Sequence, residues 1–221
     1  MSHVQTVVND AGFENNGTTT AINATSGNVL IAACSVSGST ITAIADNFGN
    51  TWVQHPDGPL NQSGAAFFYC WYTLNAIGGT GLVVTFTDAT GGQKATAISE
   101  FSGRSKTTID KHGGTLTAGS TAQTGPTLTG VAALADIWAL DFQNFAGAAV
   151  AWTPSSGFTI PTNGNVSGTV NMPASVEYQN SVSAGNFTPA FTSGSANQGA
   201  FFALSLPSGG VANTAPIAWV V

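Results

Sequence analysis

The segment Ala65–Leu74, which reads AAFFYCWYTL, decides the fold class of this chain. In an extended strand, successive side chains point to opposite faces. Because both faces of this strand are apolar, we expect it at the centre of a sheet whose outer face is also covered. Either a loop of the same chain or a neighbouring subunit could supply that cover. One face carries Phe67, Tyr69 and Trp71, and the other carries Phe68, Cys70, Tyr72 and Leu74.

The rest of the chain repeats this pattern in shorter runs. β-Branched and aromatic runs alternate with Gly, Asn, Ser and Asp, which is typical of strands joined by tight turns. Short connections favour antiparallel pairing. The pattern predicts an all-β fold: an antiparallel two-sheet β-sandwich, jelly-roll-like, in a single domain over 1–206. A Gly/Pro linker and an extended apolar C-terminal arm are expected over 207–221. The predicted strands are 4–8, 19–23, 28–36, 40–45, 51–54, 65–74, 81–87, 95–101, 107–113, 121–128, 135–142, 149–153, 174–183, 187–191 and 200–206.

One segment fits two conformations, and another predicts a specific turn. Val131–Phe142 fits the apolar spacing of a helix as well as the alternation of a strand, and the all-β context favours a strand. Asp46–Asn50 reads DNFGN. Asp and Asn side chains bond their own backbone in turns, and Gly supplies a positive φ. This segment therefore predicts a hairpin with a Gly bulge.

Charged residues are scarce, and this excludes several classes of protein. Only 6% of the 221 residues are charged, against about 25% in a typical soluble domain. The four Lys and Arg residues are too few for the basic cluster that duplex nucleic acid requires. They are also too few for a polybasic membrane anchor. The composition also argues against disorder, because 43% of the residues are hydrophobic and the net charge is only -6. We expect neither nucleic acid nor membrane as a partner.

The beginning of the chain bears on its location. The first residues, MSHVQT, lack a basic n-region and an apolar h-region, so we expect no signal peptide in this chain. No apolar run approaches the about 18 residues of a transmembrane helix. Either a signal was removed and a Met restored, or the protein leaves a cytoplasm by another route such as lysis. The expected location is a virion or the extracellular space.

The sequence contains no motif for a metal, a cofactor or a nucleophile. The three His residues lack metal-ligand spacing, and no nucleophile elbow or phosphate-binding loop occurs. A pair of carboxylates for glycoside hydrolysis could come from Asp136, Asp141 and Glu177. The odd offset between Asp136 and Asp141 places them on opposite faces of one strand, which weakens that pair. We therefore expect a non-enzymatic protein with no cofactor.

Cys34 and Cys70 both lie in apolar runs. Such surroundings favour two buried thiols that pack as small hydrophobic groups. The alternative is a possible disulfide across strands or sheets, which requires a Cα separation of about 4.4–6.8 Å.

Aromatic and basic residues supply the ligand-binding candidates. Most aromatic residues alternate with apolar neighbours, which predicts core packing. Trp52 and Trp152 lie beside turn residues, so they and Phe158 are the candidates for stacking on a sugar. The segment 103–114 holds three of the four basic residues, Arg104, Lys106 and Lys111. It is interpreted as a solvated hairpin loop or as a contact for a small anion or acidic sugar.

The stretch Ala215–Val221, which reads APIAWVV, is apolar again after the linker. It is too short to fold alone. It is expected either to fold back on its own domain or to dock on a neighbour as an arm. The candidate assembly residues are Pro216, Ile217, Trp219, Val220 and Val221.

Several motifs occur in a recognisable order. They are an apolar strand after a Gly-Asn turn, an Asp-Asn-x-Gly-Asn-Thr-aromatic hairpin, an aromatic strand, Val-Val-Thr-Phe, Ile-Ser-Glu-Phe-Ser-Gly, Gly-Phe-Thr and a closing Phe-Phe-Ala-Leu-Ser-Leu-Pro. Over 28–206 the chain resembles the jelly-roll or lectin-like β-sandwich domain family found in phage virion proteins and bacterial secreted proteins. The resemblance implies a binding or structural role. The motifs occupy 27–33, 46–52, 67–72, 83–86, 98–103, 157–159 and 201–207.

Two functions follow as expectations. The first is a structural or assembly protein of a virion or extracellular surface, such as a phage head decoration, fibre or tail-surface subunit. Native sheets protect their edges with Lys and other charges, and this chain has few to spare. Its partners would be further copies in a homo-oligomer or virion capsid and tail proteins. The alternative is a carbohydrate- or receptor-binding module, whose hydroxyl- and amide-rich surface would suit neutral glycans.

Overall fold

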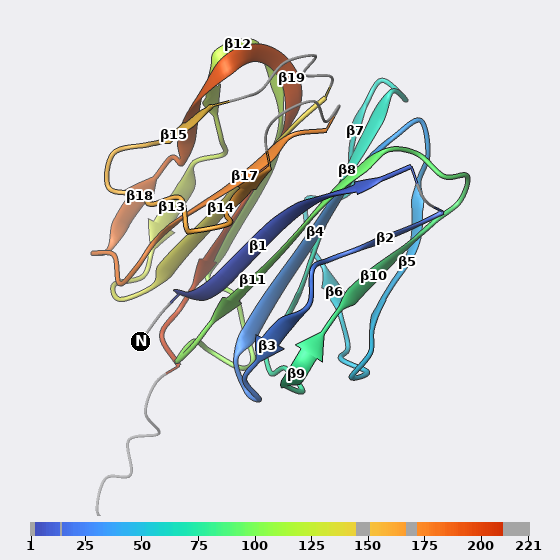
Figure 1. Cartoon of the computed structure of the whole chain (residues 1–221). Coiled ribbons are helices and arrows are strands. Elements are labelled where there is room, and N and C mark those ends of the chain that lie inside the picture. The colour runs from blue at the N-terminus through green and yellow to red at the C-terminus, as the bar shows by residue number, and fades with distance from the viewer. Residues whose placement is uncertain (1–2, 14, 145–150, 167–171, 210–221) are drawn as a thin grey trace, which may run out of the picture.

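The computed structural model describes residues 3–13, 15–144, 151–166 and 172–209. Within these ranges every helix or strand assigned is a β-strand, and every strand pairing is antiparallel. The strands form two large sheets and three small ones (Figure 1). The predicted all-β, antiparallel character is confirmed.

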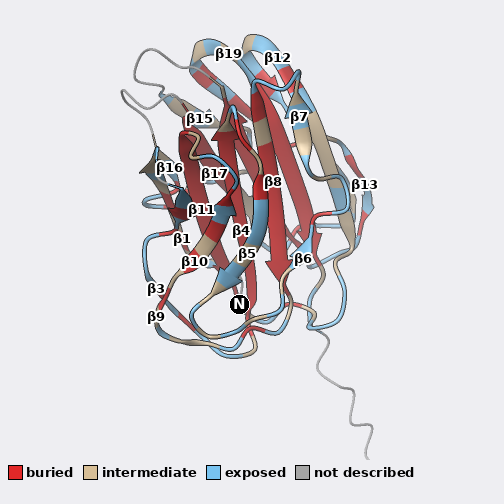
Figure 2. Cartoon of the chain, turned by 90° about the vertical axis from the view of Figure 1, so that its right-hand side faces the viewer, coloured by how far each residue is buried: buried red, intermediate tan, exposed pale blue. Residues whose placement is uncertain are grey.

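The first large sheet is built around β4 and β8, which are buried along nearly their whole length (Figure 2). Its path is β1-β11-β4-β8-β6, and β7 pairs with β8 beside that path. The strand bounds are β1 His3–Gly12, β11 Lys94–Phe101, β4 Val29–Ser37, β8 Ala66–Thr73, β6 Val53–Gln54 and β7 Leu60–Gln62.

The second large sheet follows the path β12-β19-β14-β17-β16, and β15 pairs with β19. Its central strand β14 is buried at every residue. The predicted strand over 135–142 is therefore confirmed against the helical alternative. The bounds are β12 Lys111–Thr124, β19 Ala190–Leu206, β14 Asp136–Gln143, β17 Ala174–Gln179, β16 Asn165–Val166 and β15 Trp152–Pro154.

Three small sheets cover the large ones. Their paths are β2-β10-β5, β3-β9 and β13-β18. The bounds are β2 Asn16–Thr18, β10 Val84–Asp88, β5 Ile41–Asp46, β3 Ile22–Ala24, β9 Gly79–Leu82, β13 Leu128–Val131 and β18 Gly185–Phe187.

Three apolar cores separate these layers. The central core lies between the two large sheets and includes Ile31 and Phe68 from the first, with Trp138 and Phe202 from the second. The first outer core lies between the first sheet and β10, and it includes Leu30, Trp71 and Phe86. The second outer core lies on the far face of the second sheet, and it includes Ile137, Phe201 and Leu128.

The two apolar faces predicted for Ala65–Leu74 are confirmed. Phe68 and Cys70 enter the central core, whereas Tyr69 and Trp71 enter the first outer core. The cover on the outer face comes from the chain itself, because Val84 and Phe86 of β10 share that core. The apolar outer face of β8 therefore does not require a neighbouring subunit.

The strands β12 and β19 are much longer than predicted. The sequence predicted separate strands at 107–113 and 121–128, and at 187–191 and 200–206. Instead the Gly-, Ser- and Thr-rich stretches between them pair with each other, from Leu116↔Ala200 to Ala122↔Thr192. They form a bent ribbon at the end of the second sheet (Figure 1). Main-chain pairing holds this ribbon, so its sequence carries little apolar alternation.

The turn at Asp46–Asn50 is confirmed, but the hairpin predicted there is wrong. The Asp46 carboxylate accepts hydrogen bonds from the N–H groups of Phe48 and Asn50, and Gly49 has φ +78°. However, β5 before the turn pairs with β10, whereas β6 after it pairs with β8. The turn carries the chain from a small sheet to the first large sheet.

Candidate functional site

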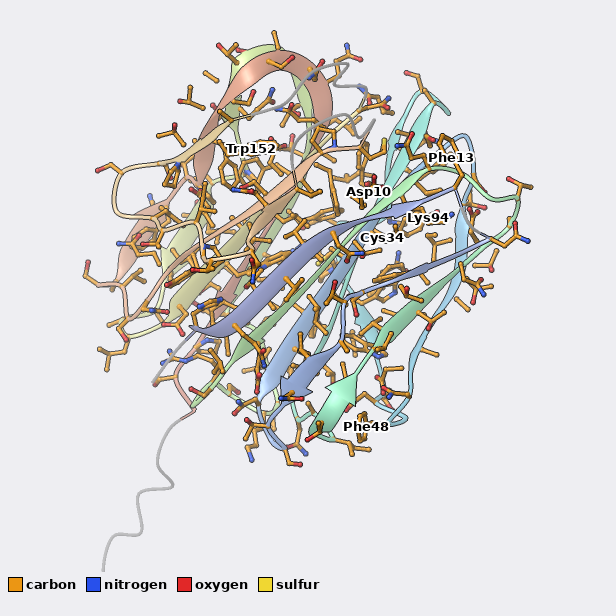
Figure 3. All side chains as sticks on the ribbon, viewed as in Figure 1. Asp10, Phe13, Cys34, Phe48, Lys94 and Trp152 are labelled. Atoms are coloured by element: carbon orange, nitrogen blue, oxygen red, sulfur yellow. The ribbon has the colours of Figure 1, made fainter. Side chains whose placement is uncertain are left out.

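The three aromatic residues predicted to bind sugars do not form one platform. Trp52 packs against the first outer core, and its indole N–H donates to the Asp46 carboxylate at 2.7 Å. Trp152 and Phe158 both pack against the second outer core. The Trp152 ring meets that of Phe191 edge-on, with centroids 5.5 Å apart. All three are half-buried, and Figure 3 places Trp152 in the half of the molecule away from Cys34 and Lys94.

Of the three candidate acids, the structure brings Asp141 and Glu177 together and places Asp136 on the other face of the sheet. Residues of β14 alternate between the central core and the second outer core, so Asp136 and Asp141 do face opposite sides. Asp141 lies opposite Ser175, and Ala139 lies opposite Glu177. Asp141 and Glu177 are therefore diagonal neighbours on one face of the sheet. Strand register, which the sequence did not provide, creates this pair.

Both acids are buried, and burial raises the pKa of each. Burial raises the pKa of Glu177 to about 7, although the N–H groups of Ser155 and Ala190 and the Ser155 hydroxyl donate to it. Burial also raises the pKa of Asp141 well above its usual range, and the nearby Glu177 raises it further. Both residues are 0% exposed. A substrate cannot reach them in this structure, so the pair does not form an active site.

The fold brings His112 next to His55 and Asp57, which lie far from it in the sequence. The Asp57 carboxylate lies 2.7 Å from Nδ1 of His112 and 3.9 Å from Nδ1 of His55. His55 is already engaged, because its Nε2 lies 3.2 Å from the Ala203 carbonyl and its Nδ1 accepts the Asp57 N–H. Burial lowers the pKa of His55 to about 4. Both nitrogens of His55 are therefore occupied by the protein itself.

Neither a metal-binding cluster nor a membrane-spanning helix occurs among the described residues. Within the described ranges, no group of three or more His, Cys, Asp or Glu side chains could hold a metal ion. No helix among the described residues is long and apolar enough to cross a bilayer.

The three basic residues of 103–114 do not form a cationic patch. Arg104 is buried, and its Nε lies 3.1 Å from Asp136. The Lys111 ammonium lies 3.6 Å from Asp110. Lys106 lines two shallow grooves, of about 370 and 350 Å³. Two of the three charges are thus matched by acids of the same chain, which removes the basis for a shared anion contact.

Cys34 and Cys70 are both buried and free. They lie on neighbouring strands, where Cys34 is opposite Tyr69 and Cys70 is opposite Ala33. Their side chains enter different cores, on opposite faces of the same sheet. The structure therefore has the two buried thiols, and the alternative disulfide is not formed because the sheet separates the sulfur atoms.

Lys94 and Asp88 form a buried ion pair that the sequence did not predict. Lys94 Nζ lies 2.6 Å from the Asp88 carboxylate, and both side chains are 0% exposed. The carboxylate also accepts hydrogen bonds from Ser39 and from the N–H groups of Thr90 and Gly92. The two residues flank a Gly-Gly turn, and this spacing alone does not distinguish a buried pair from two solvated charges.

A groove of about 470 Å³ lies between β1 and the segment 159–163. The His3 ring stacks on Tyr178 at its edge, with centroids 4.0 Å apart. That contact occupies one face of the Tyr178 ring. Asn163 accepts the Val8 N–H at 2.9 Å, so the segment also covers part of the outer edge of β1.

The sheet edges are the most distinctive exposed feature. At the ends of the two large sheets, β6 and β16 are only 2 residues long. In contrast, β12 has 14 residues and pairs with β19 on one side alone in the described structure. Among its residues only Lys111 is charged. The side chain of Leu116, on the same strand, is 46% exposed.

Exposed apolar side chains are otherwise scattered over different elements, which is normal for a protein surface. The predicted assembly residues Pro216, Ile217, Trp219, Val220 and Val221 lie outside the described residues. The large exposed side chains within the described residues are Val4, Phe13, Val53, Ile77, Leu116 and Leu134.

Comparison with known proteins gives no further guidance, because no protein-family model and no curated protein matches the chain.

Proposed function

We propose that this chain is a non-enzymatic structural subunit that assembles with copies of itself, or with other subunits, at the surface of a virion or another extracellular particle. The fold proposed for this role is a jelly-roll-like, antiparallel two-sheet β-sandwich in one domain over 1–206. The packing of the two large sheets around the central core supports that assignment.

The observation that carries the proposal is the open edge of β12. Native proteins protect exposed edges with short strands, Lys residues, Pro or bulges, because an unpaired edge is a template for another chain. One sheet end, β6, is protected by its shortness. β12 is long and has no charged residue after Lys111, although it contains register shifts near Ser120. It offers main-chain groups to a partner without charge repulsion.

The kind of particle comes from the resemblance. A head decoration, fibre or tail-surface subunit of a phage is the proposed setting, with capsid or tail proteins as further partners. The scarcity of charge suits contacts made through main-chain hydrogen bonds and neutral side chains. Such contacts depend little on ionic strength, since salt screens charges.

Analytical ultracentrifugation over a range of protein concentrations tests the proposal. We expect species heavier than the 22.2 kDa monomer, in proportions that rise with concentration and persist at high salt. Electron microscopy of the same material would show whether these species are closed particles or filaments. A monomer at every concentration, both for the full chain and after deletion of 207–221, would contradict assembly with copies of itself.

A further inference from the structure

The edge of β12 contains one regular run. From Lys111↔Ser205 to Thr117↔Gly199 its register with β19 is unbroken, and the shifts begin only after Thr117. Bulges change the twist of a strand and disrupt its pairing. A partner strand can therefore align with the seven positions 111–117, whose midpoint is Gly114.

The same run is compatible with a second copy of itself. In an antiparallel pair centred on Gly114, Lys111 lies opposite Thr117 of the second copy, so the two ammonium groups do not meet. Leu116 lies opposite His112 of the second copy, on one face of the sheet. Leu116 is 46% exposed, and the His112 side chain is 40% exposed. Their contact would cover the exposed apolar group of this edge.

We infer that two copies of this chain pair antiparallel through β12, about a two-fold axis at Gly114. The inference rests on the proposed assembly function and names the partner strand and its register. A two-fold contact uses the same patch on both copies and closes on itself. Seven residues a side bury less than the about 1,000 Å² of a stable interface. The contact is therefore weak in isolation, and other contacts between subunits of a particle would add to it.

A pair of engineered cysteines tests the register directly. The full chain carries both His112→Cys and Leu116→Cys. In the inferred pair, the new thiol at position 112 of one copy lies opposite the new thiol at position 116 of the second copy. Within one chain they are four residues apart on a strand, about 13 Å, which a disulfide cannot span. The native thiols of Cys34 and Cys70 are buried. We expect mild oxidation to give a covalent dimer on non-reducing gels, several-fold more abundant than with either single substitution or with Ile77→Cys.

A second variant tests the same edge without cross-linking. Leu116→Lys adds one charge to this edge of each copy, opposite His112 of the second copy, so we expect association to weaken about tenfold or more. Ile77→Lys is the matched control, because Ile77 is 52% exposed and lies outside the strands. It should leave association unchanged.

The outcomes separate this inference from the proposed function. A chain that associates, yet shows no more cross-linked dimer than the Ile77→Cys control, overturns the β12 pairing and leaves assembly standing. Equal weakening by Leu116→Lys and Ile77→Lys has the same meaning. A parent chain that is monomeric throughout overturns both.

Discussion

Replacing Lys94 by Met should destabilise the protein strongly, because it removes one partner of a buried ion pair. Lys94 Nζ lies 2.6 Å from Asp88 and also donates to the Gly92 carbonyl at 2.5 Å. Met keeps much of the aliphatic stem but removes the charge and its hydrogen bonds. The Asp88 carboxylate then stays buried without its cation.

The structure sets the expected magnitude. Removing one partner of a buried pair costs about 3–5 kcal/mol. Asp88 keeps hydrogen bonds from Ser39 and from the Thr90 and Gly92 N–H groups, so we expect the lower end, about 3 kcal/mol. Burial alone would raise the pKa of Asp88, yet these bonds and the one from Lys94 hold it at about 2. The hydrogen bonds from Ser39, Thr90 and Gly92 remain in the variant, and each of them favours the charged carboxylate.

Urea unfolding followed by tryptophan fluorescence measures the loss. Lys111→Met is the matched control: its ammonium lies 3.6 Å from Asp110, and its side chain is 39% exposed. An exposed pair of this kind contributes about 0–1 kcal/mol. The double variant Asp88→Asn/Lys94→Met removes both buried charges and should recover much of the stability that the single variant loses.

Two results would refute this reasoning. One is a Lys94→Met variant that loses no more stability than Lys111→Met. The other is a double variant as unstable as the single one, since the loss would then come from packing and not from an uncompensated carboxylate.

Three further predictions concern buried groups. Burial lowers the pKa of His55 to about 4 and that of His3 to about 4, so folding disfavours their protonation. The stability contribution of these two His residues should be complete above pH 6.5 and be lost as the pH falls towards 4, by up to about 3 kcal/mol for His55. His55→Gln should remove part of this pH dependence in urea titrations, and an unchanged dependence would contradict the prediction. Asp141 acts in the opposite direction: its pKa is raised in the folded protein, so its contribution to stability falls as the pH rises. Asp141→Asn should therefore raise the thermal midpoint more at pH 9 than at pH 5, and equal shifts would count against this prediction. A Cβ at Gly17 would lie 2.8 Å from Lys94 Cδ, so Gly17→Ala should cost about 1–3 kcal/mol, whereas Gly119→Ala, with no contact closer than 3.7 Å, should cost less in the same urea assay.

The sequence was informative wherever side chains alternate between two apolar layers. The double burial of Ala65–Leu74 followed from period two, whereas the strand at β14 followed from period two together with the all-β context. The ribbon formed by β12 and β19 did not, because main-chain pairing holds its Gly- and Ser-rich parts together. At Asp46 the turn was predictable from local hydrogen bonding. Which strands the turn connects was not, since that depends on partners distant in sequence.

The candidate site was less predictable for the same reason. Asp136 and Asp141 are an odd number of residues apart on one strand, so they lie on opposite faces of the sheet, as the sequence indicated. The neighbour that Asp141 does have, Glu177, depends on the register between β14 and β17. Lys94 and Asp88 lie close in the sequence, but their complete burial depends on how the small sheet containing β10 packs on the first large sheet. Register and layer packing are non-local, so residue spacing cannot supply them.

The structure also changes what the scarcity of charge implies. The outer faces of both large sheets contribute to apolar cores formed with other strands of the same chain, so these faces do not call for a partner. The long edge β1 donates the Val8 N–H to Asn163, and β6 is too short to recruit a strand. Among the ends of the large sheets in the described structure, β12 is then the edge where missing charge has a consequence. It follows that adding one Lys at Leu116 should matter more for association than adding one at other exposed apolar positions, such as Ile77.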